Sequence, residues 1–280
     1  MRKMRKIRQI VSFGLAVMMV GVTVIGAGLK ASANEGNFDL EEIQDRVEFN
    51  QRKLEKIITE EALQGVQLIK AIHIIDEDES MMSETYKEIL TGQLSNVIQS
   101  MKDYRSISDG LGEMQKQYEK YIGKRSSVTA GEIINCNKEI DLGIDNKDYI
   151  IPVDCLYVSS LFKDSRPEAI GHTGIDFVAR KNTDIKVVDD GIVIYAGDCG
   201  TYGTAVFVLH GNNKITIYAH MIKDSNTVEV GDYVSQGDVI GKVGMTGRAT
   251  GYHLHFEVIE DGERKDPIDY FDYDFEEMAK

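Results

Sequence analysis

The sequence predicts a multi-domain α + all-β protein, with an N-terminal helical module followed by an antiparallel β domain. The first observation is a heptad spacing of apolar residues in the first half of the chain, which is typical of long helices. The second is a series of short β-branched and aromatic runs, separated by glycine-rich turns, in the second half. The third is that five of the six histidines fall in this second half. We therefore expect the chemistry to lie in the β domain.

Residues 1–33 are typical of an export signal or an N-terminal membrane anchor. A basic stretch, Met1 to Arg8, precedes an uncharged apolar run from Ile10 to Leu29, and the small-residue motif Ala31-Ser32-Ala33 follows. A signal peptidase cuts at motifs of this kind, whereas an apolar run of this length can also span a bilayer. We favour cleavage after Ala33, with retention as an anchor as the alternative. Both interpretations place the remainder of the chain outside the cytoplasm.

The charge balance excludes nucleic acid as a partner. The whole chain carries a formal charge of −14, which becomes −20 when the six lysines and arginines of the first 34 residues are removed. A protein this acidic has no electrostatic route to a phosphate backbone.

The three cysteines do not indicate a disulfide framework, and without a C-x-x-C pair they do not indicate a thiolate zinc site. Their odd number leaves at least one thiol free or paired outside the chain. A bridge between Cys136 and Cys155 stays open as an alternative. Cys199 has no neighbouring base, so we interpret it as structural.

Residues 34–125 are expected to form a helical module. Its first part has a 3-4-3-4-3 seam with one polar position: Leu40, Ile43, Val47, Asn50, Leu54 and Ile57. A second helical pattern begins near Ser83 and uses Tyr86, Ile89, Leu90, Leu94, Val97, Ile98 and Met101. The acidic run 76–79 predicts a turn between the two. One interpretation is a helical hairpin that spaces the next domain from the membrane, and the other is a coiled coil that self-associates or docks a partner through residues 35–125.

Residues 126–148 are expected to be a linker, and residues 149–275 the β domain. The heptad pattern stops near Lys124, and the following segment contains Gly131, Asn135 and Asn137. Beyond it we expect strands at 185–188, 192–195, 205–209, 214–218, 233–234, 239–240 and 255–259. Gly211-Asn212-Asn213 predicts a hairpin turn between two of them. Short strands at this spacing predict an all-β sandwich or a small barrel-like domain.

Three local motifs of the β domain carry histidines. They are His172-Thr173-Gly174-Ile175-Asp176, Tyr218-Ala219-His220 and His253-Leu254-His255. Imidazole and carboxylate both suit zinc, and Gly174 allows the backbone to fold so that both reach one ion. Residues two apart on a strand point to one face, so His253, His255 and Glu257 project together. Leu254 and Phe256 are expected to face a core.

Each motif alone is a weak or moderate signal, but the three together in one β domain are specific. Two other histidines are interpreted as structural. His210 precedes the turn at Gly211 and is expected to make a local hydrogen bond, and His73 lies alone among isoleucines.

Taken together, these motifs resemble the signature of the lysostaphin/LytM-type zinc metalloendopeptidases, which are peptidoglycan hydrolases. The matching segments are Gly171 to Asp176, Tyr218 to His220 and Gly251 to Val258, with Asp190-Gly191, Gly203, Gly231-Asp232, Val234, Gly237, Gly241 and Gly244 to Gly247 between them. The resemblance covers residues ~150–272 and says nothing about residues 35–125. Two positions depart from the family pattern: Leu161-Phe162-Lys163 lacks a glycine after the phenylalanine, and Tyr252 stands where many members have proline.

The resemblance implies roles for individual residues. His172, Asp176 and His255 would ligate one zinc ion per chain, and His220 and His253 would be catalytic. Three protein ligands leave a fourth position for water, as catalytic zinc requires. Glu257 is expected to support the site rather than act as the base.

We therefore expect an exported zinc metalloendopeptidase that hydrolyses peptide bonds of peptidoglycan, in the stem peptide or the cross-bridge. It would be secreted or associated with the cell wall, or anchored to the membrane through residues 10–29 if they are not removed. One alternative is an extracytoplasmic scaffold or peptidoglycan-binding partner protein with vestigial catalysis. Another is a zinc peptidase that acts on proteins. All of the zinc ligands are present, which favours the enzyme.

Overall fold

The computed structural model of the chain describes residues 40–76, 81–122, 128–144, 147–164, 171–273 and 275. The predicted export signal or anchor and most of the predicted acidic turn lie outside these residues. The chain divides into two compact units. Of the described residues, 51–108 belong to the first unit, and 40–50 together with those from 109 onward belong to the second. None of the helices in the described ranges is long and apolar enough to cross a membrane.

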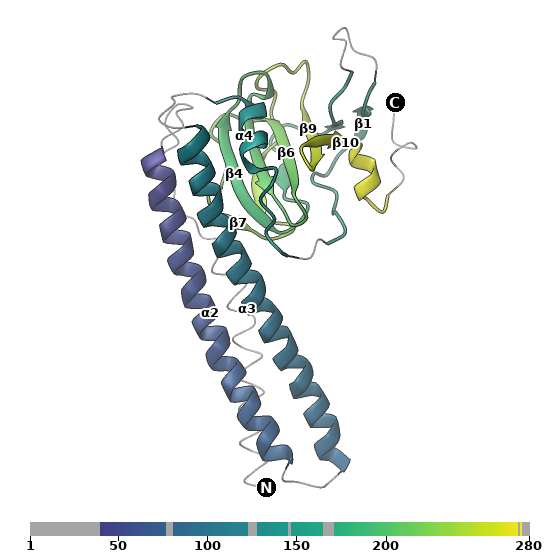
Figure 1. Cartoon of the computed structure of the whole chain (residues 1–280). Helices are drawn as coiled ribbons and strands as arrows, with labels where there is room; N and C mark the ends of the chain where they lie inside the picture. Colours follow the sequence, from purple (N-terminus) through teal and green to yellow (C-terminus); the bar gives the residue numbers. More distant parts are fainter. Residues whose placement is uncertain are drawn as a thin grey trace. The chain divides into compact units, whose positions relative to one another are not determined.

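The two predicted long helices are present as α2 (Leu40–Asp76) and α3 (Met81–Tyr121) (Figure 1). In the first unit they share a small apolar core, formed by Leu68, Ala71, Leu90 and Val97. Ile89 and Ile98, which belong to the predicted pattern, are 50% and 46% exposed. Successive residues of a helix are rotated by about 100°, which places Ile89 and Ile98 on either side of the buried stripe formed by Leu90 and Val97. Neither isoleucine is therefore part of this stripe.

Asn50, the polar position of the predicted seam, has a partner within the second unit. Its side-chain amide donates to the carbonyl of Gly231 and lies 3.4 Å from a carboxylate oxygen of Asp232. Arg46, one turn earlier on α2, forms an ion pair with Glu229. A turn of the same chain therefore satisfies the polar group of Asn50. The coiled-coil interpretation loses the support that this polar position gave it.

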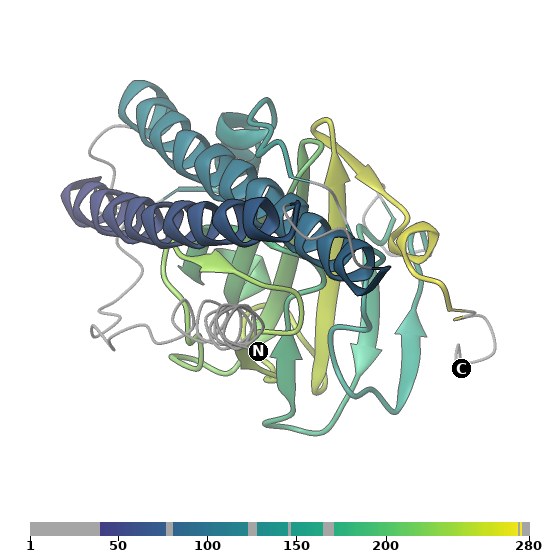
Figure 2. The same cartoon turned by 90° about the horizontal axis from the view of Figure 1, so that it is seen from below.

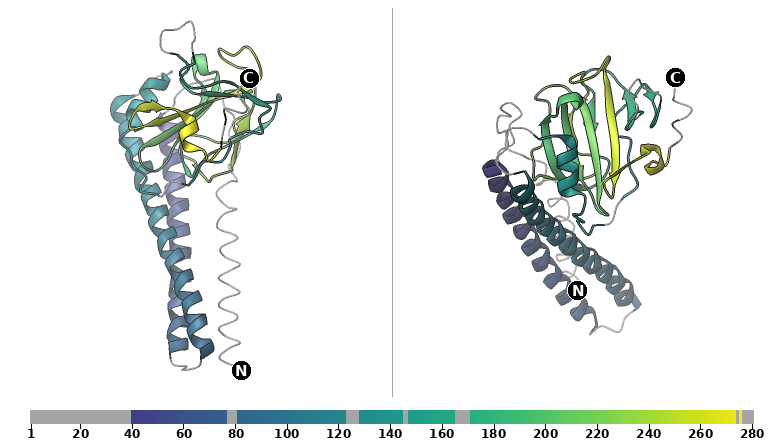
Figure 3. Two further views of the ribbon diagram at one scale, coloured as in Figure 1. Left: turned by 90° about the vertical axis from the view of Figure 1, so that its right-hand side faces the viewer. Right: turned by 45° about the horizontal axis from the view of Figure 1, so that its top comes forward.

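The segment expected to be a linker contains a third helix, α4 (Ala130–Asn137). It begins with a capping box in which Thr129 accepts from the backbone amide of Glu132, and the Glu132 carboxylate accepts from the amide of Thr129. This T-x-x-E pattern is visible in the sequence, but Gly131 and the asparagines obscure it. Ile133 is fully buried, and α4 packs against strand β4 (Gly191–Asp198) (Figure 3).

An antiparallel sheet dominates the second unit. Its strand order is β1-β2-β9-β6-β5-β4-β7, with β10 paired to β9, whereas β3 and β8 form a separate two-stranded sheet. The strands of the large sheet lie side by side in Figure 2. Besides β4, the strands are β1 (Tyr157–Ser160), β2 (Ile175–Val178), β3 (Asp184–Lys186), β5 (Thr204–Leu209), β6 (Lys214–Met221), β7 (Tyr233–Val234), β8 (Val239–Lys242), β9 (His253–Glu260) and β10 (Glu263–Lys265). Two short 3-10 helices, η1 (Gly200–Tyr202) and η2 (Pro267–Tyr270), complete the fold.

All seven predicted strands are present, and β1, β2 and β10 are additional. The turn between β5 and β6 is confirmed, since Asn212 and Asn213 both have φ = 55°, the left-handed conformation that a type I′ hairpin needs. The predicted core positions Leu254 and Phe256 are fully buried. The large sheet and the small second sheet share one buried core, which includes Ile185 of β3, Ile240 of β8 and Val206 of β5.

We predict that Tyr118→Phe destabilises the second unit. Tyr118 lies near the end of α3, is fully buried, and donates through its hydroxyl to the carbonyl of Ile194 on β4. Removal of the hydroxyl leaves a buried carbonyl without this donor, which costs about 1–3 kcal/mol. Chemical denaturation measures the loss, and Tyr121→Phe, at a position 53% exposed, is the matched control. Equal stability of the two variants would show that this contact does not attach α3 to the sheet.

Candidate metal centre

The pairing of β2 with β9 brings two motifs together. Asp176 of β2 lies directly opposite His255 of β9. Residues paired in this way project to the same face of an antiparallel sheet, with their Cβ atoms about 5 Å apart. Ala219 of β6 pairs with His255 from the other side, so the His220 that follows it is also brought next to β9.

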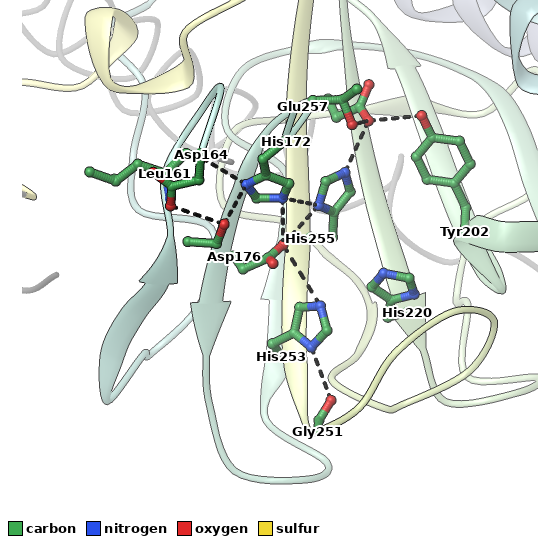
Figure 4. A network of polar contacts seen from close by, with 12 residues as sticks. Leu161, Asp164, His172, Asp176, Tyr202, His220, Gly251, His253, His255 and Glu257 are labelled. Carbon is green, nitrogen blue, oxygen red and sulfur yellow. Dashed lines mark hydrogen bonds and ion pairs between the residues drawn. The ribbon is translucent and has the colours of Figure 1, made fainter. Parts of the chain in front are cut away.

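Three side chains converge at this point (Figure 4). Nε2 of His172 lies 3.0 Å from Oδ1 of Asp176 and 3.1 Å from Nδ1 of His255, and the last two atoms are 2.8 Å apart. All three residues are buried, with exposed fractions of 3–6%. One donor atom from each lies within 4.8 Å of the others, which is the arrangement of a metal site, and no other such cluster occurs among the described residues. Two imidazoles and a carboxylate are a donor set that suits a transition metal.

The loop after β1 orients His172. Nδ1 of His172 lies 2.8 Å from the carbonyl of Leu161 and 3.0 Å from the hydroxyl of Ser160. A carbonyl oxygen only accepts hydrogen bonds, so Nδ1 carries the hydrogen of the neutral ring. Nε2 then keeps the lone pair and faces the cluster. Asp164 holds this loop by accepting from the amide of Leu161. Lys163, at the position where the family has glycine, adopts φ = 63°, a left-handed conformation that glycine adopts without strain.

Gly174 is required by packing against β9. A Cβ atom at this position would lie 2.1 Å from the carbonyl oxygen of Phe256. From the sequence alone, this glycine is expected to provide backbone freedom between His172 and Asp176. The structure gives a different reason, since only a residue without a side chain lets this backbone approach β9 so closely.

His255 is oriented by a buried acid. Its Nε2 lies 2.9 Å from Oε1 of Glu257, which is fully buried. Glu257 also accepts from Thr173, Tyr202 and Arg264. The motifs did not single out these last three residues as partners of Glu257. Glu257 itself indicates that such partners exist, because a carboxylate on a buried strand needs hydrogen-bond donors around it.

Proton affinities at the site follow from burial and from these contacts. Burial raises the pKa of Asp176, but the adjacent His172 and His255 side chains bring it well below its usual range. Burial lowers the pKa of His255, but Asp176 and Glu257 raise it to about 9 in the metal-free protein. Burial raises the pKa of Glu257, and His255, Arg264 and Thr173 lower it to about 2. Both carboxylates are therefore ionised at neutral pH, and the cluster is built to hold positive charge.

His220 and His253 flank the three converging residues. Nε2 of His253 lies 3.7 Å from Oδ1 of Asp176, and its Nδ1 lies 2.9 Å from the carbonyl of Gly251. The ring of His220 is centred 4.8 Å from that of His253. Nδ1 of His220 lies 2.9 Å from the carbonyl of Thr246, and its backbone has φ = 61°, a conformation that carries strain in a non-glycine residue. Burial, together with the neighbouring His253 and His255, lowers the pKa of His220 to about 4.

The other histidines and the cysteines lie apart from this cluster. His210 is buried, and its two ring nitrogens contact the carbonyl of Asp190 at 2.8 Å and the hydroxyl of Thr216 at 2.7 Å. The structural interpretation of His210 is thus supported, and one of its partners is more distant in sequence than expected. His73 is exposed. The three cysteines are free thiols.

Comparison with known proteins identifies the domain that carries this site. Residues 170–267 match the family model of peptidase family M23. The chain is 41% identical over 97 residues to the DD-carboxypeptidase/endopeptidase Mpg of Neisseria meningitidis, a match that covers 35% of this chain and 22% of that protein. It is 37% identical over 121 residues to the peptidoglycan DD-endopeptidase ShyC of Vibrio cholerae, covering 41% and 28%. The chain therefore contains a peptidase M23 domain, of the lysostaphin/LytM type, and spans less than a third of these curated relatives.

Among solved structures, the catalytic domain of lysostaphin from Staphylococcus simulans is 27% identical. That match covers 41% of this chain and 91% of that one, with a TM-score of 0.36, which is too low to support an argument about the fold. The family model and the His172–Asp176–His255 cluster agree on one metal-binding site of the M23 kind.

We predict that His172→Ala abolishes metal binding and that His73→Ala leaves it unchanged. The first variant removes one of three donors, whereas His73 is an exposed residue of α2. Metal content should also fall on acidification of the wild-type protein, because ligands must be deprotonated to bind. Elemental analysis of the purified variants at several pH values measures both effects. Equal metal content in the two variants would contradict this assignment of the site.

Proposed function

We propose that the chain is an exported zinc metalloendopeptidase that hydrolyses peptide bonds of bacterial peptidoglycan. The observation that carries the proposal is the convergence of His172, Asp176 and His255 in an M23 domain, with His220 and His253 beside them. Relatives that match this domain are named for peptidoglycan DD-endopeptidase activity. We therefore take a peptide bond between two D-configured residues as the first substrate to test.

The residues present fit a catalytic zinc ion. Two nitrogens and one oxygen would hold it. They come from His172 in the loop before β2, Asp176 on β2 and His255 on β9. The outward nitrogens of both imidazoles are occupied by Leu161 and Glu257, as they are in zinc sites where ligand orientation is fixed. When bound, zinc would polarise the scissile carbonyl and lower the pKa of the attacking water.

His220 and His253 would supply the proton chemistry. Each has one ring nitrogen that faces a backbone carbonyl, of Thr246 and Gly251 respectively, which leaves the other nitrogen as the functional atom. We propose that one of the two takes a proton from water while the other stabilises the oxygen on which negative charge develops. Their rings approach from β6 and β9, so they reach the substrate from different sides.

Export and domain organisation are part of the proposal. The basic and apolar N-terminal segment followed by Ala31-Ser32-Ala33 supports action outside the cytoplasm, where peptidoglycan lies. We propose a catalytic domain at residues 149–275, preceded by a helical module at 34–125. The packing of α4 on β4 implies that the connecting segment, 126–148, contributes to the stability of the catalytic domain.

Three single variants separate metal binding from chemistry. We predict that His255→Ala loses zinc, whereas His220→Ala and His253→Ala keep it and lose activity by about 10²–10⁴-fold, the usual contribution of an acid/base group. The measurement is zinc content together with mass spectrometry of the fragments released from purified peptidoglycan, with zinc and with chelator.

The same experiment tests the alternative functions. Zinc-loaded wild-type protein that releases no peptidoglycan fragments would contradict the proposed function and favour a scaffold. If His220→Ala loses zinc as completely as His255→Ala does, the metal ligands differ from the proposed set.

A further inference from the structure

The buried carboxylate of Glu257 is the centre of a network that lies on the side of His255 away from the metal donors. Oε1 of Glu257 lies 2.9 Å from Nε2 of His255, and Oε2 lies 2.8 Å from Nε of Arg264. The hydroxyls of Thr173 and Tyr202 donate to Oε1 at 2.6 and 2.8 Å. Every donor that faces this carboxylate therefore comes from a different segment of the chain.

Tyr202 and Arg264 also contact each other. Nη2 of Arg264 donates to the hydroxyl of Tyr202 at 3.2 Å, and the same hydroxyl donates to Glu257. Tyr202 belongs to η1, and Arg264 belongs to β10, where it pairs with Ile259 of β9. Tyr202 thus holds Oε1 of Glu257 and Arg264 holds Oε2, which fixes the plane of the carboxylate. Figure 4 shows Tyr202, Glu257 and His255.

The orientation of Glu257 decides which nitrogen of His255 can bind a metal. Arg264 donates to Oε2 and Tyr202 to Oε1 of Glu257, so the carboxylate acts as the acceptor and Nε2 of His255 carries the hydrogen of their contact. In the neutral, metal-binding form of the ring the lone pair is then on Nδ1, the atom that faces Asp176 at 2.8 Å and His172 at 3.1 Å. His172 has the opposite arrangement, with Nε2 toward the cluster. A rotated Glu257 would not enforce this choice.

We propose that Arg264 and Tyr202 are positioning residues of the metal centre, which act on His255 through the carboxylate of Glu257. Arg264 holds Oε2 of the buried carboxylate and Tyr202 holds Oε1, so the two side chains set its orientation. This inference rests on the proposed zinc site and deepens it. It assigns a functional reason to β10 and η1, two elements that carry none of the residues in the histidine motifs.

The test is zinc affinity of the full chain, measured by competition with a chromophoric chelator. Arg264→Gln and Tyr202→Phe should each weaken zinc binding by roughly 10- to 100-fold, the usual effect of losing a partner that orients a ligand. Arg264→Lys, which keeps the charge, should recover part of the affinity. Lys265→Gln is the matched control for charge, since Lys265 pairs with Glu263 on the same strand. Tyr270→Phe is the control for the hydroxyl, because Tyr270 donates to Glu260.

A double-variant comparison separates positioning from general stability. If Arg264 acts through Glu257, then Arg264→Gln should have little further effect on zinc affinity in a Glu257→Gln background. Circular dichroism of the metal-free proteins checks that each variant is folded. An undiminished effect of Arg264→Gln in that background would overturn the proposal. Zinc affinity equal to wild type in both Arg264→Gln and Tyr202→Phe would do the same.

This outcome is independent of the proposed enzymatic activity. Zinc affinity does not require peptidoglycan cleavage, so an inactive but zinc-binding wild-type protein leaves the network testable. A wild-type protein that binds no zinc would contradict the metal centre itself, and with it the role of the network.

Discussion

The pairing of Asp176 with His255 across β2 and β9 is the contact on which the site depends. A shift of this register by one residue would turn His255 toward the core and Leu254 toward the metal. Gly174 protects the register, because any side chain there would collide with the backbone of β9. The position of the donors is therefore decided by strand pairing, and the side chains need only small adjustments to converge.

Once the strands are paired, the remaining contacts restrict the chemistry of each imidazole. Leu161 holds His172 by Nδ1, and Glu257 holds His255 by Nε2, so the two rings present different nitrogens to the same point. The neighbouring His220 and His253 also face backbone carbonyls through Nδ1, and they lie beside the three-residue donor cluster. The sequence contains several histidines, and the structure places two of them with Asp176 in one donor cluster and two others beside it.

Much of this site could be predicted from the sequence because its donors lie in short local motifs. Local spacing places His253 and His255 on one strand face, and the resemblance of the combined motifs to a known family assigns His172, Asp176 and His255 as donors. The partners of Glu257 could not be predicted in the same way. Thr173, Tyr202 and Arg264 meet only after η1 and β10 are folded against β9, and no local spacing connects them.

The fold shows the same division between local and long-range signals. The long helices and seven strands follow from periodicity, and the Asn212-Asn213 turn from its residues. The sequence does not predict β1, which ends in two serines, or β2, which includes the buried Asp176 that a strand pattern does not anticipate. The heptad spacing predicts that Asn50 lies in a coiled-coil seam. Its actual partner, Gly231, is 181 residues away and gives no local signal. Only tertiary contacts reveal why a polar residue occupies that seam.

The most direct test of the account is X-ray absorption spectroscopy of the zinc-loaded protein, combined with anomalous diffraction from its crystals. We expect nitrogen and oxygen ligands at about 2.0–2.2 Å without sulfur, as two imidazoles and a carboxylate require. The anomalous peak should lie between Nε2 of His172, Nδ1 of His255 and the carboxylate of Asp176. A sulfur ligand, or a peak centred on His220 and His253, would contradict the claim that the pairing of β2 with β9 builds the metal centre.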